Sequence, residues 1–294
     1  MRSGLTLERY RRLTMAAMVL LYIIVVSGAT VRLTGSGLGC SSWPQCESYR
    51  AVPAADFHAW VEFGNRLFTG AVAIAVVLAV LGARRLTEPR PDLVRLAWGL
   101  VAGVVAQILI GGITVRLELL PGIVAVHFLV SMVLIVNATV LHFRAGVRES
   151  QPQLPTQIVG GIWAMFAATS VVTILGTVVT AAGPHAGDED ANRLNVPLES
   201  VAKIHTASVF VLIAIVAFLI WSLLKSPYAE AAVTTSLKIF VGIVVIQATI
   251  GYIQYFNDIP ALLVGAHVAG ATASLLAATW TLLLATSAKR QVLS

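Results

Sequence analysis

The sequence predicts an all-α integral membrane protein with eight transmembrane helices, organised as two pseudo-symmetric four-helix bundles through a parallel internal repeat. Three observations predict this class: an apolar composition, eight apolar runs of bilayer length, and a repeat that relates the two halves. Of the 294 residues, 57% are hydrophobic and 12% are charged, whereas soluble domains contain about 25% charged residues. The mean hydropathy of +0.85 therefore excludes a soluble protein.

Eight apolar runs are long enough to be transmembrane helices, since about 20 residues span the hydrocarbon core. The connections between them are too short for a soluble domain. The first run exceeds the apolar core of a signal peptide, which is about 7–15 residues, and we expect it to be retained. The runs cover about residues 13–33, 63–83, 94–115, 121–143, 157–182, 199–224, 234–255 and 260–287.

The basic residues are unevenly divided between the two sides of these spans, with fourteen on the side of the amino terminus and six on the other. Because Lys and Arg near span ends favour the cytoplasm, we expect a multi-pass protein of the cell membrane with both termini cytoplasmic. The net charge of +6 is explained by this orientation, and no nucleic-acid partner is indicated. The fourteen are Arg2, Arg9, Arg11, Arg12, Arg84, Arg85, Arg90, Arg95, Arg144, Arg148, Lys225, Lys238, Lys289 and Arg290, and the six are Arg32, Arg50, Arg66, Arg116, Arg193 and Lys203.

The chain repeats itself at an offset of 140 residues, which aligns residues 104–111 with residues 244–251. A duplicated unit of four helices keeps its orientation, because four is an even number. The two halves, residues 1–150 and 151–294, are therefore predicted to be related by an axis along the membrane normal. The informative matches are Gln107 with Gln247, Gly111 with Gly251, His127 with His267 and Asn65 with His205.

Three histidines share one depth in the predicted membrane. His127, His205 and His267 each follow the start of a span by six or seven residues, which is roughly 9–10 Å at ~1.5 Å per residue. His205 and His267 belong to the same half, and we expect them to face each other across the bundle, as axial ligands do. The alternative is that each is a hydrogen-bonded residue that joins helices.

Such a histidine pair is suited to haem. Two neutral imidazoles with few carboxylates nearby form a poor cage for a divalent ion, whereas haem needs two axial nitrogens and apolar walls. Small residues such as Gly265 and Gly270 leave room for a flat macrocycle. The remaining histidines are expected to be solvated, to snorkel or to organise loops; they are His58, His142 and His185.

The first half differs, because Asn65 stands where the repeat calls for a second histidine. Asn65 is a weak, neutral iron ligand. Glu62 lies on the same helix face one turn earlier, and a carboxylate inside an apolar span is a candidate functional group. As a catalytic residue it would accept a proton or stabilise cationic character beside a cofactor. The alternatives are an ion pair with Arg66 or a boundary carboxylate at the helix amino end.

Basic residues also lie at the outer rim, near the histidine layer. Arg66, Lys203 and Arg116 are candidates to pair with the propionates of two haems. Basic side chains at a membrane edge also commonly snorkel to the interface, which is the alternative.

Both cysteines, Cys40 and Cys46, lie in the outer loop after the first span. This compartment permits disulfides, and the five intervening residues around Trp43-Pro44 make closure feasible, although sequence does not determine the separation of the α-carbons. A disulfide here is either a staple that orders the loop or a redox pair that exchanges electrons with a partner.

Several motifs follow one another along the chain. The first loop contains Arg32-Leu-Thr-Gly-Ser-Gly-Leu-Gly-Cys40, followed by Trp43-Pro44 and Cys46. The next span opens with Glu62-Phe-Gly-Asn-Arg66, and the three histidines follow in duplicated four-helix halves. Taken together, these features resemble the haem A synthase family, and the resemblance covers essentially the whole chain.

The resemblance implies an oxidoreductase that converts the C8 methyl group of haem O to the formyl group of haem A by successive hydroxylations, for cytochrome oxidase. It implies a haem b between His205 and His267 in the carboxyl-terminal half. The amino-terminal half would handle haem O and haem A through His127 and Glu62. Haem O synthase, an electron donor and membrane lipid are the implied partners, and a homo-oligomer is left open. Many members have His where this chain has Asn65, so we expect a more open iron site here.

Two other functions are alternatives to haem A synthesis. A dihaem electron-transfer cytochrome linked to a quinol would need two complete histidine pairs, but only one half has its pair. A transporter would place polar groups near the midplane, whereas these histidines lie near one edge of the membrane.

Overall fold

The computed structural model describes residues 4–48, 52–53, 55–146, 154–226 and 231–287. These residues form eight α-helices, and each helix is long and apolar enough to cross a membrane. The predicted all-α class and the eight predicted spans are thereby confirmed. The helices are α1 (Leu7–Leu33), α2 (Phe57–Arg84), α3 (Pro91–Arg116), α4 (Pro121–Arg144), α5 (Thr156–Ala182), α6 (Leu198–Lys225), α7 (Ala231–Tyr255) and α8 (Ala261–Ser287).

Several helices begin before the apolar runs, because capping groups decide where a helix starts. The helix α2 begins at Phe57 and not near residue 63, since the side chain of Asp56 accepts the backbone N–H of Ala59 at 2.8 Å. The helices α3 and α4 each begin with a proline, Pro91 and Pro121. Proline suits this position because the first turn leaves its N–H groups unpaired in any case.

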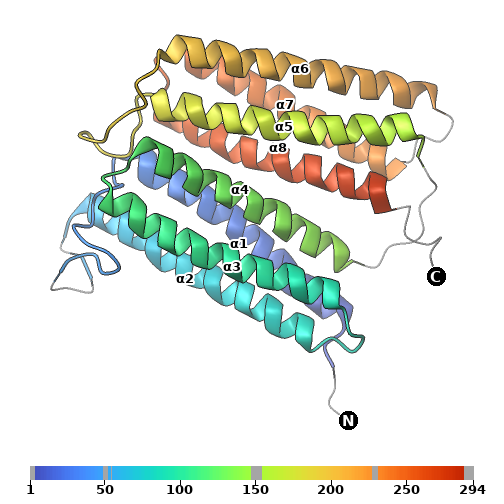
Figure 1. The fold of residues 1–294 in the computed structure, drawn as a ribbon, viewed down its shortest axis with the longest axis horizontal. Helices are drawn as coiled ribbons and strands as arrows, with labels where there is room; N and C mark the ends of the chain where they lie inside the picture. The colour runs from blue at the N-terminus through green and yellow to red at the C-terminus, as the bar shows by residue number, and fades with distance from the viewer. Residues whose placement is uncertain (1–3, 49–51, 54, 147–153, 227–230, 288–294) are drawn as a thin grey trace.

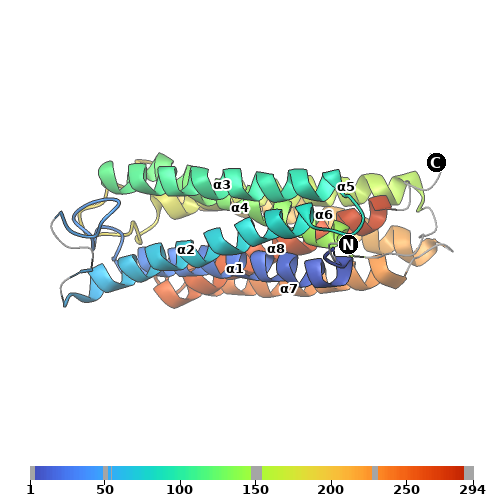
Figure 2. The ribbon, with the colours of Figure 1, turned by 90° about the horizontal axis from the view of Figure 1, so that it is seen from below.

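The helices α1–α4 lie together, as do α5–α8, and all eight run along one common direction (Figures 1 and 2). Buried apolar side chains form one cluster mainly within α1–α4 and another mainly within α5–α8. The two groups meet where α1 and α4 pack against α8 and where α4 packs against α5. In the second group, α6 packs mainly on α5, and α7 packs mainly on α8.

The helix α1 begins, and α8 ends, at the same end of the molecule, opposite the end that carries the loop with the cysteines (Figure 1). This arrangement places both termini of the described bundle on one side of a membrane. That this side is cytoplasmic stays a prediction. Some of the basic residues on which the predicted orientation rests lie outside the described residues, namely Arg2, Arg50, Arg148, Lys289 and Arg290.

The turns between α3 and α4 and between α7 and α8 share one backbone conformation. Glu118 and Leu119 have φ of 48° and 59°, and Asp258 and Ile259 have φ of 57° and 54°. In both turns the second of these residues donates its N–H, at 2.9 Å, to the carbonyl of the residue five positions earlier. The offset of 140 residues therefore relates the backbones of these turns as well as their sequences.

One prediction about the histidines is wrong. His142 does not snorkel or face solvent, because only 2% of it is exposed. Its Nδ1 lies 3.0 Å from the hydroxyl of Thr14 on α1, and its ring stacks on Trp280 of α8. His142 lies near the carboxyl end of α4, and α1 and α8 cover that end.

Candidate functional site

The histidine pair predicted for the second half faces across the bundle. His205 on α6 and His267 on α8 have ring centroids 6.5 Å apart, with the ring planes at 77°. Two metal–nitrogen bonds of about 2 Å each account for much of this separation, and the rest corresponds to the two ring radii. The spacing suits one metal ion held between two imidazoles.

Each histidine of the layer has a buried nitrogen without a protein partner. The Nδ1 atoms of His127, His205 and His267 are buried and accept or donate no hydrogen bond within the described residues. A buried polar atom without a partner is costly. Because none of these Nδ1 atoms makes a well-formed hydrogen bond among the described residues, the three histidines fit a role as ligands better than a role in joining helices.

A glycine on the preceding helix makes room for each of these rings. A Cβ atom on Gly111, Gly176 or Gly251 would lie 3.5, 3.3 or 3.3 Å from Cε1 of His127, His205 or His267, respectively. The last two distances are tighter than most Cβ contacts. The small residue therefore decides how deeply the ring can sit between the helices.

The donor set fits haem better than a caged ion. Within the described residues, no group of three or more His, Cys, Asp or Glu side chains could hold a metal ion. The second half offers two facing imidazoles and apolar surroundings, and a haem iron, already bound by its macrocycle, needs only such axial ligands.

The position opposite His127 in the repeat is occupied by Asn65 on α2, as the sequence indicates. Its Oδ1 accepts a hydrogen bond from Ser27 of α1 at 2.7 Å. The side chain is thus oriented by a neighbouring helix. That Asn65 leaves an open iron site opposite His127 stays a prediction.

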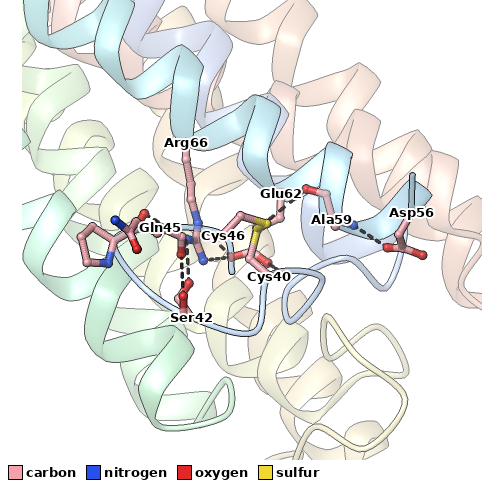
Figure 3. The surroundings of a disulfide bond; sticks show 9 residues. Cys40, Ser42, Gln45, Cys46, Asp56, Ala59, Glu62 and Arg66 are labelled. Atoms are coloured by element: carbon pink, nitrogen blue, oxygen red, sulfur yellow. Dashed lines mark hydrogen bonds and ion pairs between the residues drawn. A yellow bond between two sulfur atoms is a disulfide. The ribbon is translucent and has the colours of Figure 1, made fainter. Parts of the chain in front are cut away.

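The predicted disulfide between Cys40 and Cys46 is confirmed, with 4.5 Å between the α-carbons (Figure 3). Both cysteines are buried, and they pack with Ala59 of the first turn of α2. Ser42 donates its backbone N–H to the carbonyl of Cys46 at 3.1 Å, which closes the loop further. The loop is a compact cap at the amino end of α2.

Glu62 joins this cap to α2. One carboxylate oxygen, Oε2, accepts the backbone N–H of Cys40 at 2.7 Å. The other, Oε1, pairs with Arg66, which lies one turn further along α2 (Figure 3). Glu62 is 5% exposed, so the ion pair is shielded from solvent. The structure thus contains the ion pair that was the alternative to a purely catalytic role, and the two roles are compatible.

Arg66 binds the disulfide loop from the same site. Its Nη1 donates to the carbonyl oxygens of Ser42, Pro44 and Gln45 at 2.9, 3.3 and 3.1 Å. With Nε and Nη2 directed at Glu62, the guanidinium connects the loop backbone to the carboxylate. Pairing of Arg66 with a propionate stays a prediction.

The other basic residues of the rim have partners of their own. Lys203 pairs with Glu199 at 2.6 Å, and both side chains are mostly exposed. Arg116 lies over the ring of Trp43, 5.8 Å from its centroid. Their pairing with haem propionates also stays a prediction.

Two of the three histidines outside the predicted layer, His58 and His185, organise loops, as expected. His58 lies in the first turn of α2, and its Nδ1 is 2.9 Å from the hydroxyl of Ser36. His185 donates through Nε2 to the carbonyl of Ile259 at 2.8 Å. The first contact joins the loop after α1 to the start of α2, and the second connects the loop between α5 and α6 to the loop between α7 and α8.

Arg32 at the end of α1 connects the two halves, a role that neither its place in the first-loop motif nor its charge indicates. Its Nε donates to the carbonyl of His185 at 2.6 Å, and its Nη2 donates to the carbonyl of Thr180 at 2.8 Å. Nothing in the local sequence indicates these partners, which lie about 150 residues away.

Residues 11–280 match the COX15-CtaA family, described as cytochrome oxidase assembly protein. The chain belongs to this family. The match includes α2–α7 and most of α1 and α8, and with them every site residue described above.

Among curated proteins, this COX15-CtaA member is similar to several heme A synthases. It is 35% identical to that of Geobacillus thermodenitrificans over 99 residues, which are 33% of this chain and 31% of the relative. It is 40% identical to that of Geobacillus kaustophilus over 70 residues, or 24% and 22% of the two chains. With that of Symbiobacterium thermophilum it shares 28% identity over 186 residues, or 59% and 60%. The chain thus spans less than two thirds of the length of each of these relatives.

Proposed function

We propose that this protein is a haem A synthase, an oxidoreductase that converts the C8 methyl group of haem O to the formyl group of haem A for cytochrome oxidase. Membership of the COX15-CtaA family and the names of the similar proteins support the proposal. The observation that carries it is the pair of facing imidazoles, His205 and His267, each with a buried and unpaired Nδ1.

In this proposal the two halves bind different haems. The carboxyl-terminal half, residues 151–294, holds haem b through His205 and His267. The amino-terminal half, residues 1–150, binds haem O through His127 and releases haem A. This division is supported by the single complete histidine pair, since Asn65 stands where the first half would need its second imidazole.

We infer that the halves form two pseudo-symmetric bundles related by an axis along the membrane normal. The shared offset of 140 residues, the matching left-handed turns at residues 118–119 and 258–259, and the grouping of α1–α4 and α5–α8 support this arrangement. The same inference places the histidines near the outer face, with both termini cytoplasmic.

The chain's own residues have separate roles in the reaction. His205 and His267 orient haem b, which when bound supplies one-electron transfer. His127 holds the iron of the substrate from one side, and Asn65 leaves the opposite side open. Glu62 keeps a carboxylate at a fixed position one turn from Asn65, where it accepts a proton or stabilises cationic character in the substrate. Arg66 and the N–H of Cys40 keep that carboxylate in place.

The alternative of a dihaem electron-transfer cytochrome has less support, because it needs a second imidazole in the first half. Haem extraction separates the two functions. Membranes that contain this chain and a haem O synthase should yield haem A. Recovery of haem b together with unmodified haem O, under conditions that support the reaction in a known heme A synthase, would contradict the proposal.

A further inference from the structure

Two glutamines within the membrane helices make the same contact at equivalent places in the repeat. Gln107 on α3 donates through Nε2 to the main-chain carbonyl of His127 at 3.0 Å. Gln247 on α7 donates through Nε2 to the main-chain carbonyl of His267 at 2.8 Å. Each glutamine therefore reaches across a helix interface to the backbone of a histidine in the proposed iron-binding layer.

Each glutamine acts together with a glycine on its own helix. Gly111 and Gly251 lie four residues after Gln107 and Gln247, so glutamine and glycine share one helix face. The glycine lies against the imidazole of the neighbouring helix, at Cε1, and the glutamine binds the carbonyl of the same histidine. The carbonyl of a helical residue points toward the carboxyl terminus, which in an antiparallel neighbour is the direction from the glycine back to the glutamine.

These paired contacts determine the rotation and the axial position of the helix that carries the histidine. A ring seated on the glycine and a carbonyl bound one turn away restrain both rotation of the helix about its axis and sliding along its neighbour. Rotation or sliding of α8 would move the His267 ring relative to His205. The direction in which the imidazole points is thus set from the adjacent helix.

Further contacts show that each glutamine is closely fitted. The side chain of Gln247 lies directly against Gly270 of α8, where a Cβ atom would collide with its amide. Gln107 is also hydrogen-bonded to Ser131, whose hydroxyl in turn donates to the carbonyl of His127 at 3.2 Å. The Oε1 atoms of both glutamines are buried and have no partner within the described residues. Burying an amide oxygen without a partner costs free energy. This cost favours a specific role for the glutamines over simple filling of the helix interface.

His205 lacks this arrangement, although a glycine also lies against its ring. Its carbonyl accepts a hydrogen bond from Ser208 of its own helix at 2.6 Å, and no hydrogen bond to this carbonyl from a side chain of α5 is seen among the described residues. In the part of the chain that the structure describes, each half therefore contains one histidine whose backbone is bound by a glutamine of the neighbouring helix.

We propose that Gln107 and Gln247 are positioning residues that orient the iron-binding histidines, Gln107 for the substrate haem at His127 and Gln247 for haem b at His267. The proposal rests on the proposed function, because it takes these histidines to be iron ligands. Loss of an outer contact that orients a metal ligand typically weakens binding by about 10–100-fold.

Methionine substitutions test this proposal, because Met keeps the length and much of the volume of Gln but removes the donor. The matched control is Asn137→Leu. Asn137 donates its side-chain N–H to the carbonyl of Leu96 at 3.1 Å, so it joins the same two helices as Gln107 but far from His127. A role in helix packing alone would affect Asn137→Leu as much as Gln107→Met.

Each variant of the full-length chain is purified from membranes, and haem b dissociation, the haem b midpoint potential and the affinity for added haem O are measured. We expect Gln247→Met to accelerate haem b loss about 10-fold or more and to shift the midpoint potential. We expect Gln107→Met to weaken haem O binding about as much and to leave haem b unchanged. Asn137→Leu should leave all three properties unchanged.

The outcomes distinguish this proposal from the function on which it rests. Wild-type protein that retains no haem b and binds no haem O contradicts the proposed function. If the wild type binds both haems, and Gln247→Met and Gln107→Met behave like Asn137→Leu, the positioning role is overturned. If one methionine variant loses its helical signal, the other variant decides the question in its own half.

Discussion

Glu62 accepts the backbone N–H of Cys40 at 2.7 Å, so the carboxylate in the second helix is bound directly to the disulfide loop. The same carboxylate pairs with Arg66, whose Nη1 binds three carbonyls of that loop. The loop, the arginine and the carboxylate therefore form one structural unit at the amino end of α2. A change in the loop is therefore expected to alter the position of the Glu62 carboxylate, which is the group proposed to act on the substrate.

Glu62→Gln should leave haem b bound and stop the conversion of haem O. The amide is nearly isosteric, but it cannot take up a proton in the same way or hold a negative charge. We expect the rate of haem A formation to fall by about 100-fold or more, as for other positioned acid–base groups. Haem extraction and the absorption spectrum of the purified protein measure the two effects separately.

Glu199→Gln is the matched control for Glu62→Gln, because Glu199 also pairs with a basic residue one turn later on its helix. That pair is mostly exposed, and exposed ion pairs contribute little. The control should retain full activity. Full activity of Glu62→Gln would remove Glu62 from the mechanism.

Replacing Cys40 and Cys46 with serine should loosen the outer loop and lower haem A formation, with haem b unaffected. Closing a loop of this length stabilises a protein by about 2 kcal/mol in the chain-entropy model. Limited proteolysis from the outer side of sealed vesicles should cleave the variant faster than the wild type.

Temperature separates the two roles considered for the cysteines. If the disulfide is a staple, activity of the double serine variant should recover at low temperature, where the loop stays folded. If the cysteines exchange electrons, the variant should remain inactive at every temperature.

Gly251→Ala should disturb haem b binding. The added methyl group would lie 3.3 Å from Cε1 of His267, so the ring must move by a few tenths of an ångström, and overpacking of this kind costs about 1–3 kcal/mol. We expect an altered haem b spectrum and faster haem loss.

Gly242→Ala is the control on the same helix, since a Cβ atom there meets no atom within 4 Å. It should be neutral or slightly stabilising, because alanine favours a helix by about 0.5–1 kcal/mol over glycine. Equal haem b loss in the two variants would show that the contact with His267 is unimportant.

Asn65→His should convert the first half into a two-histidine site. With haem O bound, the wild type should show one low-spin haem, at His205 and His267, and a second haem with an open position. The variant should show two low-spin haems and less haem A, measured by electron paramagnetic resonance and haem extraction. Two low-spin haems with two histidines each in the wild type would disprove the open site.

Reporter fusions test the orientation in the membrane. A reporter active only in the cytoplasm should be active at the carboxyl terminus and inactive when inserted between α5 and α6, near residue 190. The reverse pattern would show that the distribution of Lys and Arg does not set the orientation here.

Much of the fold follows from composition, because an apolar run in a bilayer must satisfy its backbone hydrogen bonds internally and so becomes a helix. Eight runs therefore predict eight helices, and the shared depth of the three histidines follows from their distance to the helix starts. Some helix starts followed less well, since Asp56 and Pro91 act as local signals for α2 and α3 that hydropathy does not register.

Contacts between distant segments could not be predicted in the same way. Gln107 and Gln247 stand out in the repeat, but only the packing of α3 on α4 and of α7 on α8 shows that each binds a histidine carbonyl. The burial of His142 was missed, because Thr14 and Trp280 are brought to it from α1 and α8.

The sequence by itself determined the membrane class, the eight helices, the repeat and the residues that resemble a haem A synthase, since these depend on composition, order and spacing. The sequence also predicts that His205 faces His267 and leaves an ion pair between Glu62 and Arg66 open, and the tertiary structure decided both points. Only the tertiary structure revealed that the N–H of Cys40 binds Glu62 and that Arg32 reaches the carbonyls of α5 and its loop. These relationships depend on the rotation of each helix about its axis and on the path of each loop. Side-chain packing between helices sets both, and no local stretch of sequence encodes them.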